Sequence, residues 1–224
     1  MSRSDVVFLV DVDNTLLDND SVIGDIMHFL EDTIGTDGQR RYWEIFGQLR
    51  SELGYADYLG ALQRYRVAEP KDVHLLQLAA YLIDYPFAGR LYPGALQVIK
   101  HLGQWGPVVI LSDGDVVFQP RKVERSGLSA AVEGRVLIYV HKERMLDDVE
   151  ARYPATHYVM IDDKLRILDA MKTAWGTRLT TVFPRQGHYA MDPEILRRYP
   201  AADVSVDAIG DLAGIDRVAF TKGL

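Results

Sequence analysis

The sequence VVFLVDVDNTL, residues 6–16, begins with five consecutive apolar residues and continues with two aspartates and a threonine. An apolar run of this length predicts a buried strand of a parallel sheet. Asp11 and Asp13 are two positions apart, so their side chains point the same way from an extended chain. Open α/β sheets form their ligand crevices at the ends of such strands. The stretch therefore predicts a site where two carboxylates bind a divalent cation or share catalytic work.

Length and composition describe an ordinary globular protein. The 224 residues suffice for one large core and a smaller second domain. The formal net charge of −7 argues against a broad surface for nucleic acid or anionic membrane. The chain has no cysteine, which excludes disulfides, thiol catalysis and cysteine-ligated zinc. Because we find neither an export signal nor an apolar segment of spanning length, we expect a cytoplasmic protein.

Helical periodicity begins after Leu17. Val22, Ile26 and Leu30 recur at the spacing of one helix face, and Gly35 interrupts the pattern. Similar patterns predict further helices over residues 39–53, 56–67 and 70–83. We therefore expect a helical domain at residues 18–89. Because it follows the first strand, this domain should emerge above the suspected site and act as a lid.

From residue 90 onward the pattern alternates between strands and helices. Strands are predicted at residues 108–111, 135–140, 157–161, 178–183 and 202–206. One helix is predicted to end near residue 102, and four more are predicted at residues 117–125, 142–152, 165–174 and 208–212. Such alternation indicates a parallel sheet covered on both faces. The predicted fold class is α/β: a Rossmann-like, doubly wound parallel sheet formed by residues 1–17 and 90–224, with an inserted α-helical cap at 18–89.

Polar residues follow three more of these strands. A serine before a small-residue turn can offer its hydroxyl and backbone N–H groups to an anion. A lysine and an acidic pair follow the next two strands and supply a cation and possible metal ligands. Together these strand ends bring the parts needed for phosphoryl transfer to one edge of the sheet. The residues are Ser112, Asp113, Gly114, Lys142, Asp162 and Asp163.

With these motifs in this order, the chain resembles the haloacid dehalogenase superfamily of hydrolases over essentially its whole length. Residues 11–15 resemble the first motif, Asp-x-Asp-x-Thr, and Ser112, Lys142 and the pair at 162–163 resemble the second, third and fourth. The resemblance implies a core of the superfamily type with a helical cap of the C1 type. It also implies that Asp11 is a nucleophile that becomes an aspartyl-phosphate, and that Asp13 is the general acid and then the base.

The resemblance further implies a Mg²⁺ cofactor. Asp11, the backbone carbonyl of Asp13 and Asp163 would hold the ion, and Asp162 would act through water. Ser112 and Lys142, with Asp113 beside them, would bind the phosphoryl group. Thr15, Gly114, Lys122 and His188 are further candidates for the site. Lys164 departs from the small or hydroxyl residue expected after the acidic pair and places a cation beside the metal.

Several assignments have alternatives. Lys122 competes with Lys142 as the phosphate-binding lysine, and Asp162 could instead cap the helix expected near Leu165. His188 follows the strand at 178–183, so it either borders the crevice or lies on a surface loop. Arg50, Arg64 and Arg66 either meet an anionic substrate or belong to solvated helix faces. The remaining histidines show no metal-ligand spacing and are expected in packing or surface positions: His28, His74, His101, His141 and His157.

The predicted function is a Mg²⁺-dependent phosphatase, similar to phosphoglycolate phosphatases, that hydrolyses a small phosphorylated metabolite. The expected partner is that metabolite, with no nucleic acid and no membrane. A sugar phosphomutase would keep every motif, and a sensor of a phosphorylated ligand is the alternative of another class. A dehalogenase is disfavoured because it needs no leaving-group acid, which is the role that Asp13 supplies.

Overall fold

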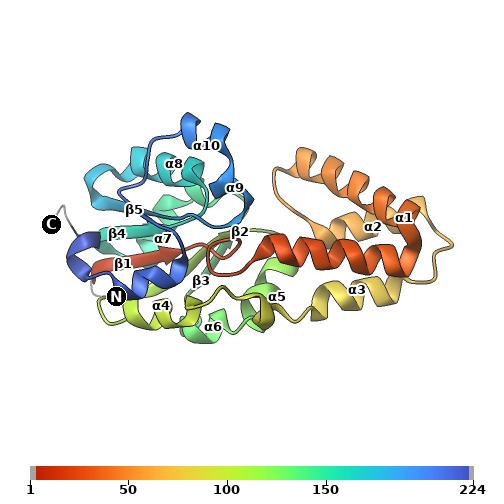
Figure 1. Ribbon diagram of the computed structural model, residues 1–224, viewed down its shortest axis with the longest axis horizontal. Coiled ribbons are helices and arrows are strands. Elements are labelled where there is room, and N and C mark those ends of the chain that lie inside the picture. Colours follow the sequence, from red (N-terminus) through yellow and green to blue (C-terminus); the bar gives the residue numbers. More distant parts are fainter. Residues whose placement is uncertain (1–3, 222–224) are drawn as a thin grey trace.

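A computed structural model describes residues 4–221, which form a single six-stranded parallel sheet beside a group of helices (Figure 1). The order of the strands in the sheet is β3-β2-β1-β4-β5-β6. This arrangement confirms the predicted α/β class with a parallel sheet. The strands are β1 (Ser4–Val10), β2 (Val108–Asp113), β3 (Val136–Tyr139), β4 (Ala155–Ile161), β5 (Leu179–Pro184) and β6 (Val204–Val206).

Strand β1 lies in the middle of the sheet and is buried on both faces. Its side chains alternate between two apolar clusters: Phe8 and Val10 belong to one, and Val7 and Leu9 to the other. The continuous apolar run at 6–10 thus arises because neither face of the strand meets water. The chain continues from β1 to β2 and β3 on one side and later to β4, β5 and β6 on the other. That reversal places a crevice at the carboxyl end of β1.

Helices cover both faces of the sheet, and Figure 1 shows α4 to α6 on one side and α8 to α10 on the other. Two predictions need correction: residues 142–152 form a 3-10 turn followed by a helix, and the last predicted helix is a 3-10 helix. Short helices α6, α9 and α10 were missed because so few residues carry no periodic signal. The helices are α4 (Ala95–Leu102), α5 (Phe118–Arg125), α6 (Leu128–Ala131), α7 (Leu146–Arg152), α8 (Leu165–Trp175), α9 (Gly187–Met191) and α10 (Pro193–Arg198); the 3-10 helices are η1 (Phe87–Arg90), η2 (Lys142–Arg144), η3 (Gly176–Arg178), η4 (Ile209–Gly214) and η5 (Arg217–Phe220).

The inserted helices are α1 (Asn19–Leu53), α2 (Tyr58–Ala68) and α3 (Leu75–Asp84), and we call them the cap. Gly35 has a left-handed φ of +74° and divides α1 into two limbs, as the interrupted periodicity predicts. The predicted start of α3 at residue 70 is wrong. There the Asp72 carboxylate accepts hydrogen bonds from the Tyr65 hydroxyl and the His74 N–H, which form a turn before the helix begins.

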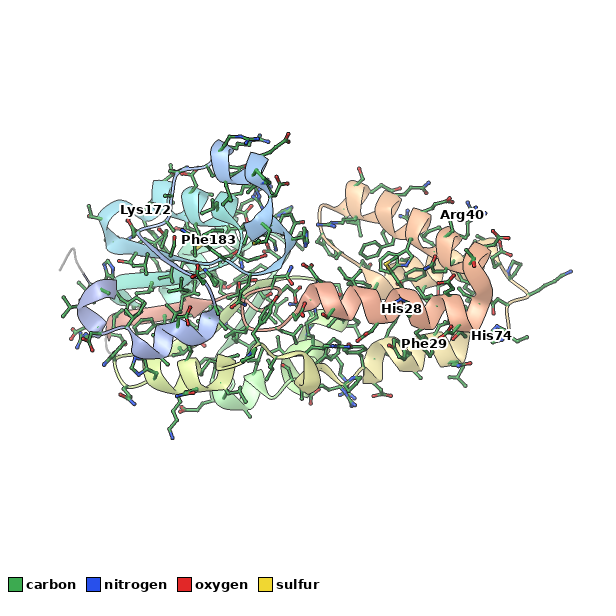
Figure 2. All side chains as sticks on the ribbon, in the orientation of Figure 1. His28, Phe29, Arg40, His74, Lys172 and Phe183 are labelled. Atoms are coloured by element: carbon green, nitrogen blue, oxygen red, sulfur yellow. The ribbon has the colours of Figure 1, made fainter. Side chains whose placement is uncertain are left out.

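The cap extends away from the sheet and is tied to the core at its base. Figure 2 shows His28, Phe29, Arg40 and His74 on the cap, far from the strand ends, so neither of these histidines belongs to the crevice. At the base, the Arg90 guanidinium pairs with the carboxylate of Asp25 on α1. Within residues 4–221, no helix is both long enough and apolar enough to cross a membrane.

Candidate active site

The acidic residues that follow β1 and β4 meet because those two strands are neighbours. Val10 is in register with Ile161, and the Asp11 N–H donates to the Ile161 carbonyl at 2.9 Å. Asp11, Asp162 and Asp163 are all buried, and each offers one carboxylate oxygen within 4.8 Å of the others. The structure therefore brings together three of the four residues expected at the metal.

Thr15 positions this cluster from the turn after β1. Its hydroxyl is fully buried and accepts a hydrogen bond from the Asp163 N–H at 3.0 Å. Asn14, in the left-handed region with a φ of +58°, accepts hydrogen bonds through Oδ1 from the N–H groups of Asn19 and Asp20. The turn thus connects the first motif to the fourth motif and to the first residues of the cap.

Lys142 lies beside the predicted nucleophile. Its side chain is completely buried, and Nζ is 2.5 Å from Asp11 Oδ1 and 2.6 Å from Asp162 Oδ2. The Asp113 carboxylate accepts a hydrogen bond from the Lys142 backbone N–H at 2.7 Å, which fixes where the lysine enters the site. Burial alone would lower the pKa of Lys142, but the charges of Asp11 and Asp162 raise it above its ordinary value. The lysine is therefore an ammonium ion at neutral pH.

The free carboxylate oxygens in this cluster suit a divalent cation. One oxygen of Asp11 and both oxygens of Asp163 are buried and have no hydrogen-bond partner. Burial raises the pKa of Asp163 well above its usual range, the charges of Asp162 and Asp11 raise it further, and the ammonium of Lys164 opposes them. A hard cation such as Mg²⁺ prefers such oxygen ligands and would remove the cost of ionising them.

Lys122 contacts the other aspartate of the first motif. Its Nζ donates to Asp13 Oδ1 at 2.6 Å and to Asn19 Oδ1 at 2.8 Å, and only 1% of its side chain is exposed. Phe118 lies beneath the ammonium at 5.3 Å from ring centroid to Nζ. The two lysines that sequence reasoning treated as alternatives therefore occupy different places: Lys142 at Asp11, and Lys122 at Asp13.

We expect Lys122→Met to lower the free energy of unfolding by about 1–3 kcal/mol, because Asp13 and Asn19 lose a buried charged donor. Urea titration with fluorescence detection measures this loss. Lys100→Met, at an exposed lysine of α4, is the matched control and should change stability by less than about 0.5 kcal/mol. Equal stability of the two variants would show that the buried contacts of Lys122 contribute nothing.

The residues after β2 differ from the expected anion cradle. The Gly114 N–H donates to the Tyr139 carbonyl at 2.9 Å, so it is not free for a phosphoryl oxygen. The Asp115 carboxylate accepts the N–H groups of Val117 and Phe118 at the start of α5, so that helix terminus is already occupied. The N–H groups of Gly114, Val117 and Phe118 therefore have acceptors within the protein, and an anion at this turn would have to be bound by other groups.

Ser112, predicted to bind the phosphoryl group, lies at the end of β2. Its hydroxyl is buried, accepts a hydrogen bond from Gln119 Nε2 at 3.0 Å and donates a long one to the Asp113 carbonyl at 3.4 Å. A hydroxyl can rotate, so this proton could turn to a phosphoryl oxygen instead. Sequence reasoning missed Gln119, although a glutamine seven positions after the motif serine, in the first turn of a predicted helix, was a usable signal. Burial raises the pKa of the neighbouring Asp113, which lines the cavity described below.

His188 and Tyr189 join the core to the cap. The His188 N–H and Nδ1 lie 2.8 and 2.7 Å from the carboxylate oxygens of Asp20, at the start of α1. Farther along α1, Arg50 donates to the Tyr189 hydroxyl at 2.9 Å. Both residues also line the cavity described next. Of the two placements predicted for His188, a crevice border or a surface loop, the structure therefore shows the crevice border.

A cavity of about 530 Å³ lies between the cap and the carboxyl ends of the strands. Asp13 and Lys164 line it from the core, and Phe46 and Tyr58 line it from the cap. His141, expected in a packing or surface position, is also part of its wall. Most of the cap residues in the wall could not be identified from the sequence, because helical periodicity does not say which helix face meets the core.

The comparisons with known proteins place this architecture in a family. The profile of the haloacid dehalogenase-like hydrolases matches residues 6–174. A haloacid dehalogenase-like hydrolase from Burkholderia xenovorans LB400 is 64% identical; the match covers 96% of this chain and 98% of that chain, with a TM-score of 0.91. The protein therefore belongs to the family of haloacid dehalogenase-like hydrolases. The search of curated proteins gave no match.

More distant structures share the fold alone. The hydrolase YfnB from Bacillus subtilis, described as bound to magnesium, is 18% identical with a TM-score of 0.61, and the match covers 95% of this chain and 98% of that chain. An L-2-haloacid dehalogenase from Xanthobacter autotrophicus, with chloropropionic acid covalently bound, is 17% identical with a TM-score of 0.59 over 93% and 96% of the two chains. The fold thus accommodates proteins described by different chemistries.

Proposed function

We propose that the protein is a Mg²⁺-dependent phosphatase that hydrolyses a small phosphorylated metabolite through an aspartyl-phosphate on Asp11. The observation that carries this proposal is the placement of Asp13. Its carboxylate lines the cavity, is 24% exposed, and is held by the buried ammonium of Lys122. A carboxyl group at that point can give a proton to a leaving oxygen and take one from a water molecule. Phosphoryl transfer needs such a general acid and base, whereas dehalogenation needs no acid for its leaving group.

In the first step, an Asp11 carboxylate oxygen attacks phosphorus while the bond from phosphorus to the ester oxygen breaks. The leaving oxygen takes a proton from Asp13, which ends the step as a carboxylate. Lys142 orients Asp11 through its 2.5 Å contact and places a positive charge beside the oxygens that gain negative charge. The hydroxyl of Ser112 can donate to one of those oxygens.

In the second step, a water molecule attacks the phosphorus of the aspartyl-phosphate and gives its proton to Asp13, which regenerates the acid. Phosphate leaves and Asp11 is free again. Asp11, the backbone carbonyl of Asp13 and Asp163 would hold Mg²⁺, with Asp162 beside them. When bound, the ion supplies positive charge that reduces repulsion between the carboxylates and the phosphate dianion.

The first test compares three reactions of the purified protein. We expect Mg²⁺-dependent release of phosphate from p-nitrophenyl phosphate and no release of chloride from 2-chloropropionate. The dehalogenase arm is included because the Xanthobacter enzyme of similar fold carries chloropropionic acid. Chloride release without phosphatase activity would overturn the proposal. Analysis of products from a sugar phosphate separates hydrolysis from a mutase reaction, in which the phosphoryl group returns to the sugar.

The metal proposal predicts how stability depends on pH. The pKa of Asp163 is raised in the folded state, so the folded protein holds more protons than the unfolded chain above the ordinary pKa of about 3.9. Its contribution to stability is therefore present at low pH and is lost as the pH rises through the raised value. Mg²⁺ needs ionised ligands and should reverse that loss.

We therefore expect added Mg²⁺ to raise the melting temperature more at about pH 8 than at about pH 5. Differential scanning fluorimetry with and without the ion measures this difference. In Asp163→Asn the effect of Mg²⁺ should shrink at both pH values. A stabilisation that is equal at both pH values would contradict this prediction.

A further inference from the structure

The cavity has a charge distribution that phosphoryl transfer alone does not require. Its acidic wall residues already have partners within the protein. Lys122 contacts Asp13, backbone N–H groups contact Asp113 and Asp115, and Arg166 pairs with Glu143 at 2.8 Å. Each acidic residue of the wall thus has at least one ion-pair or hydrogen-bond partner within the protein.

Several basic wall residues have no such partner. Among the arginines in residues 4–221, five have no carboxylate within ion-pair distance: Arg50, Arg66, Arg144, Arg197 and Arg198. Three of these five, Arg50, Arg144 and Arg198, line this one cavity. They come from α1, η2 and α10, so the topology gathers them from three separate parts of the chain. In a protein of net charge −7, this local excess of positive charge points to an anionic ligand.

The proposed reaction does not use these three arginines for the transferred phosphoryl group. That group needs charge beside Asp11, where Lys142 is 2.5 Å from the carboxylate. Lys164, which follows the acidic pair and lines the same cavity, places a second ammonium on the core side. The guanidinium groups are therefore available to another part of the substrate.

Aromatic residues from the cap and from α5 of the core form one part of the cavity wall. The ring centroids of Phe46 and Tyr58 are 4.8 Å apart, and those of Tyr58 and Phe118 are 4.4 Å apart. All three rings line the cavity, and each belongs to a residue with less than a tenth of its surface exposed. Such a wall favours an apolar or aromatic body rather than a heavily hydroxylated one.

We propose that the substrate is a doubly anionic phosphate ester: the transferred phosphoryl group at Asp11, an apolar or aromatic body against Tyr58, and a second anionic group bound by Arg50, Arg144 and Arg198. This inference rests on the proposed phosphatase function and names its substrate class. The second group is a carboxylate or a second phosphoryl group, since a guanidinium binds either through paired N–H donors.

The test compares phenyl phosphate, 4-carboxyphenyl phosphate and 1,4-phenylene bisphosphate as substrates. We expect kcat/KM to be at least about tenfold higher for one of the two doubly anionic esters than for phenyl phosphate, as for a charged hydrogen-bonded pair. The preferred ester tells whether the second group is a carboxylate or a phosphoryl group. Equal kcat/KM values for all three esters would overturn the inference.

The variants show whether the arginines cause the preference. Arg144→Gln and Arg198→Gln should each reduce the preference about fivefold or more, with most of the change in KM. Arg197→Gln is the matched control, because Arg197 is the adjacent unpaired arginine on α10 and lies outside the cavity wall. A loss of preference in the control equal to that in Arg198→Gln would overturn the assignment.

Arg50 needs its own control because it also bonds to Tyr189. Tyr189→Phe removes that hydrogen bond and keeps the guanidinium, so it should retain the preference that Arg50→Gln loses. If Tyr189→Phe lost the preference as fully as Arg50→Gln, Arg50 would be a cap contact and not a ligand for the anion.

A binding experiment separates this inference from the phosphatase proposal. Isothermal titration with benzylphosphonate and 4-carboxybenzylphosphonate, which cannot be hydrolysed, measures the preference without turnover. Arginine-dependent discrimination with no hydrolysis of any ester would support the subsite and overturn the phosphatase. Hydrolysis without discrimination, in either turnover or binding, would overturn the subsite and leave the phosphatase standing.

Discussion

Asp11→Asn is expected to reduce the hydrolysis of p-nitrophenyl phosphate by more than about 10³-fold, because the amide cannot form the aspartyl-phosphate. The substitution preserves the shape of a buried side chain. It also removes one negative charge from a cluster in which Asp162 and Asp163 have raised pKa values. We therefore expect the melting temperature in metal-free buffer to stay level or rise, while activity is lost.

Two measurements make that result specific. Asp37→Asn, at an exposed aspartate that pairs only with Arg40, is the matched control and should keep both activity and stability. Mass spectrometry of the acid-quenched protein should detect a phosphoryl adduct in the unsubstituted protein and none in Asp11→Asn. A variant that retains full turnover would remove Asp11 from the mechanism and with it the proposed reaction.

Lys142→Met is expected to lower the free energy of unfolding by about 3–5 kcal/mol in metal-free buffer. The ammonium is completely buried between Asp11 and Asp162, and its removal leaves their carboxylates without a cation at 2.5 and 2.6 Å. Activity should also fall about 10²-fold or more, because the charge beside the reacting oxygens is lost. Urea unfolding followed by steady-state kinetics at saturating Mg²⁺ measures both effects.

The control for Lys142 is a lysine with a comparable but exposed ion pair. Lys172 pairs with Asp203 at 2.7 Å, and both side chains are more than a third exposed, so Lys172→Met should cost less than about 1 kcal/mol. A double-mutant cycle with Asp162→Asn should return part of the stability, because it removes one of the unpaired charges. A loss no larger than that of Lys172→Met would contradict the buried charge balance.

Both predictions concern contacts around Asp11 and Lys142 that could be predicted only in part from the sequence. Residues 6–16 identified β1 and its two aspartates, since an uninterrupted apolar run can be buried on both faces only inside a parallel sheet. The later strand ends supplied Ser112, Lys142 and the acidic pair, and their resemblance to four motifs identified the family. These inferences succeeded because the period of a strand and the residues at its end are local properties of the chain.

Other features depended on contacts between distant residues. From the sequence, both Lys122 and Lys142 could be the phosphate-binding lysine. The pairing of β2 with β3 places Lys142 beside Asp11, and the position of α5 places Lys122 beside Asp13. In the turn after β2, the Tyr139 carbonyl accepts the Gly114 N–H, and the Asp115 carboxylate accepts the N–H groups of Val117 and Phe118. A motif cannot show such competition for hydrogen bonds.

The sequence by itself determined the class of fold, the inserted helical cap and the acidic residues of the crevice, because each follows from apolar periodicity or from a short motif. Only the tertiary structure decided which cap residues face that crevice and that Arg50, Arg144 and Arg198 share its wall. Those three residues are separated by up to 148 positions, the difference between 198 and 50, and no local signal groups Arg50, already a candidate, with the other two. Their common environment arises from the packing of the cap on the core, which periodicity along one helix does not encode.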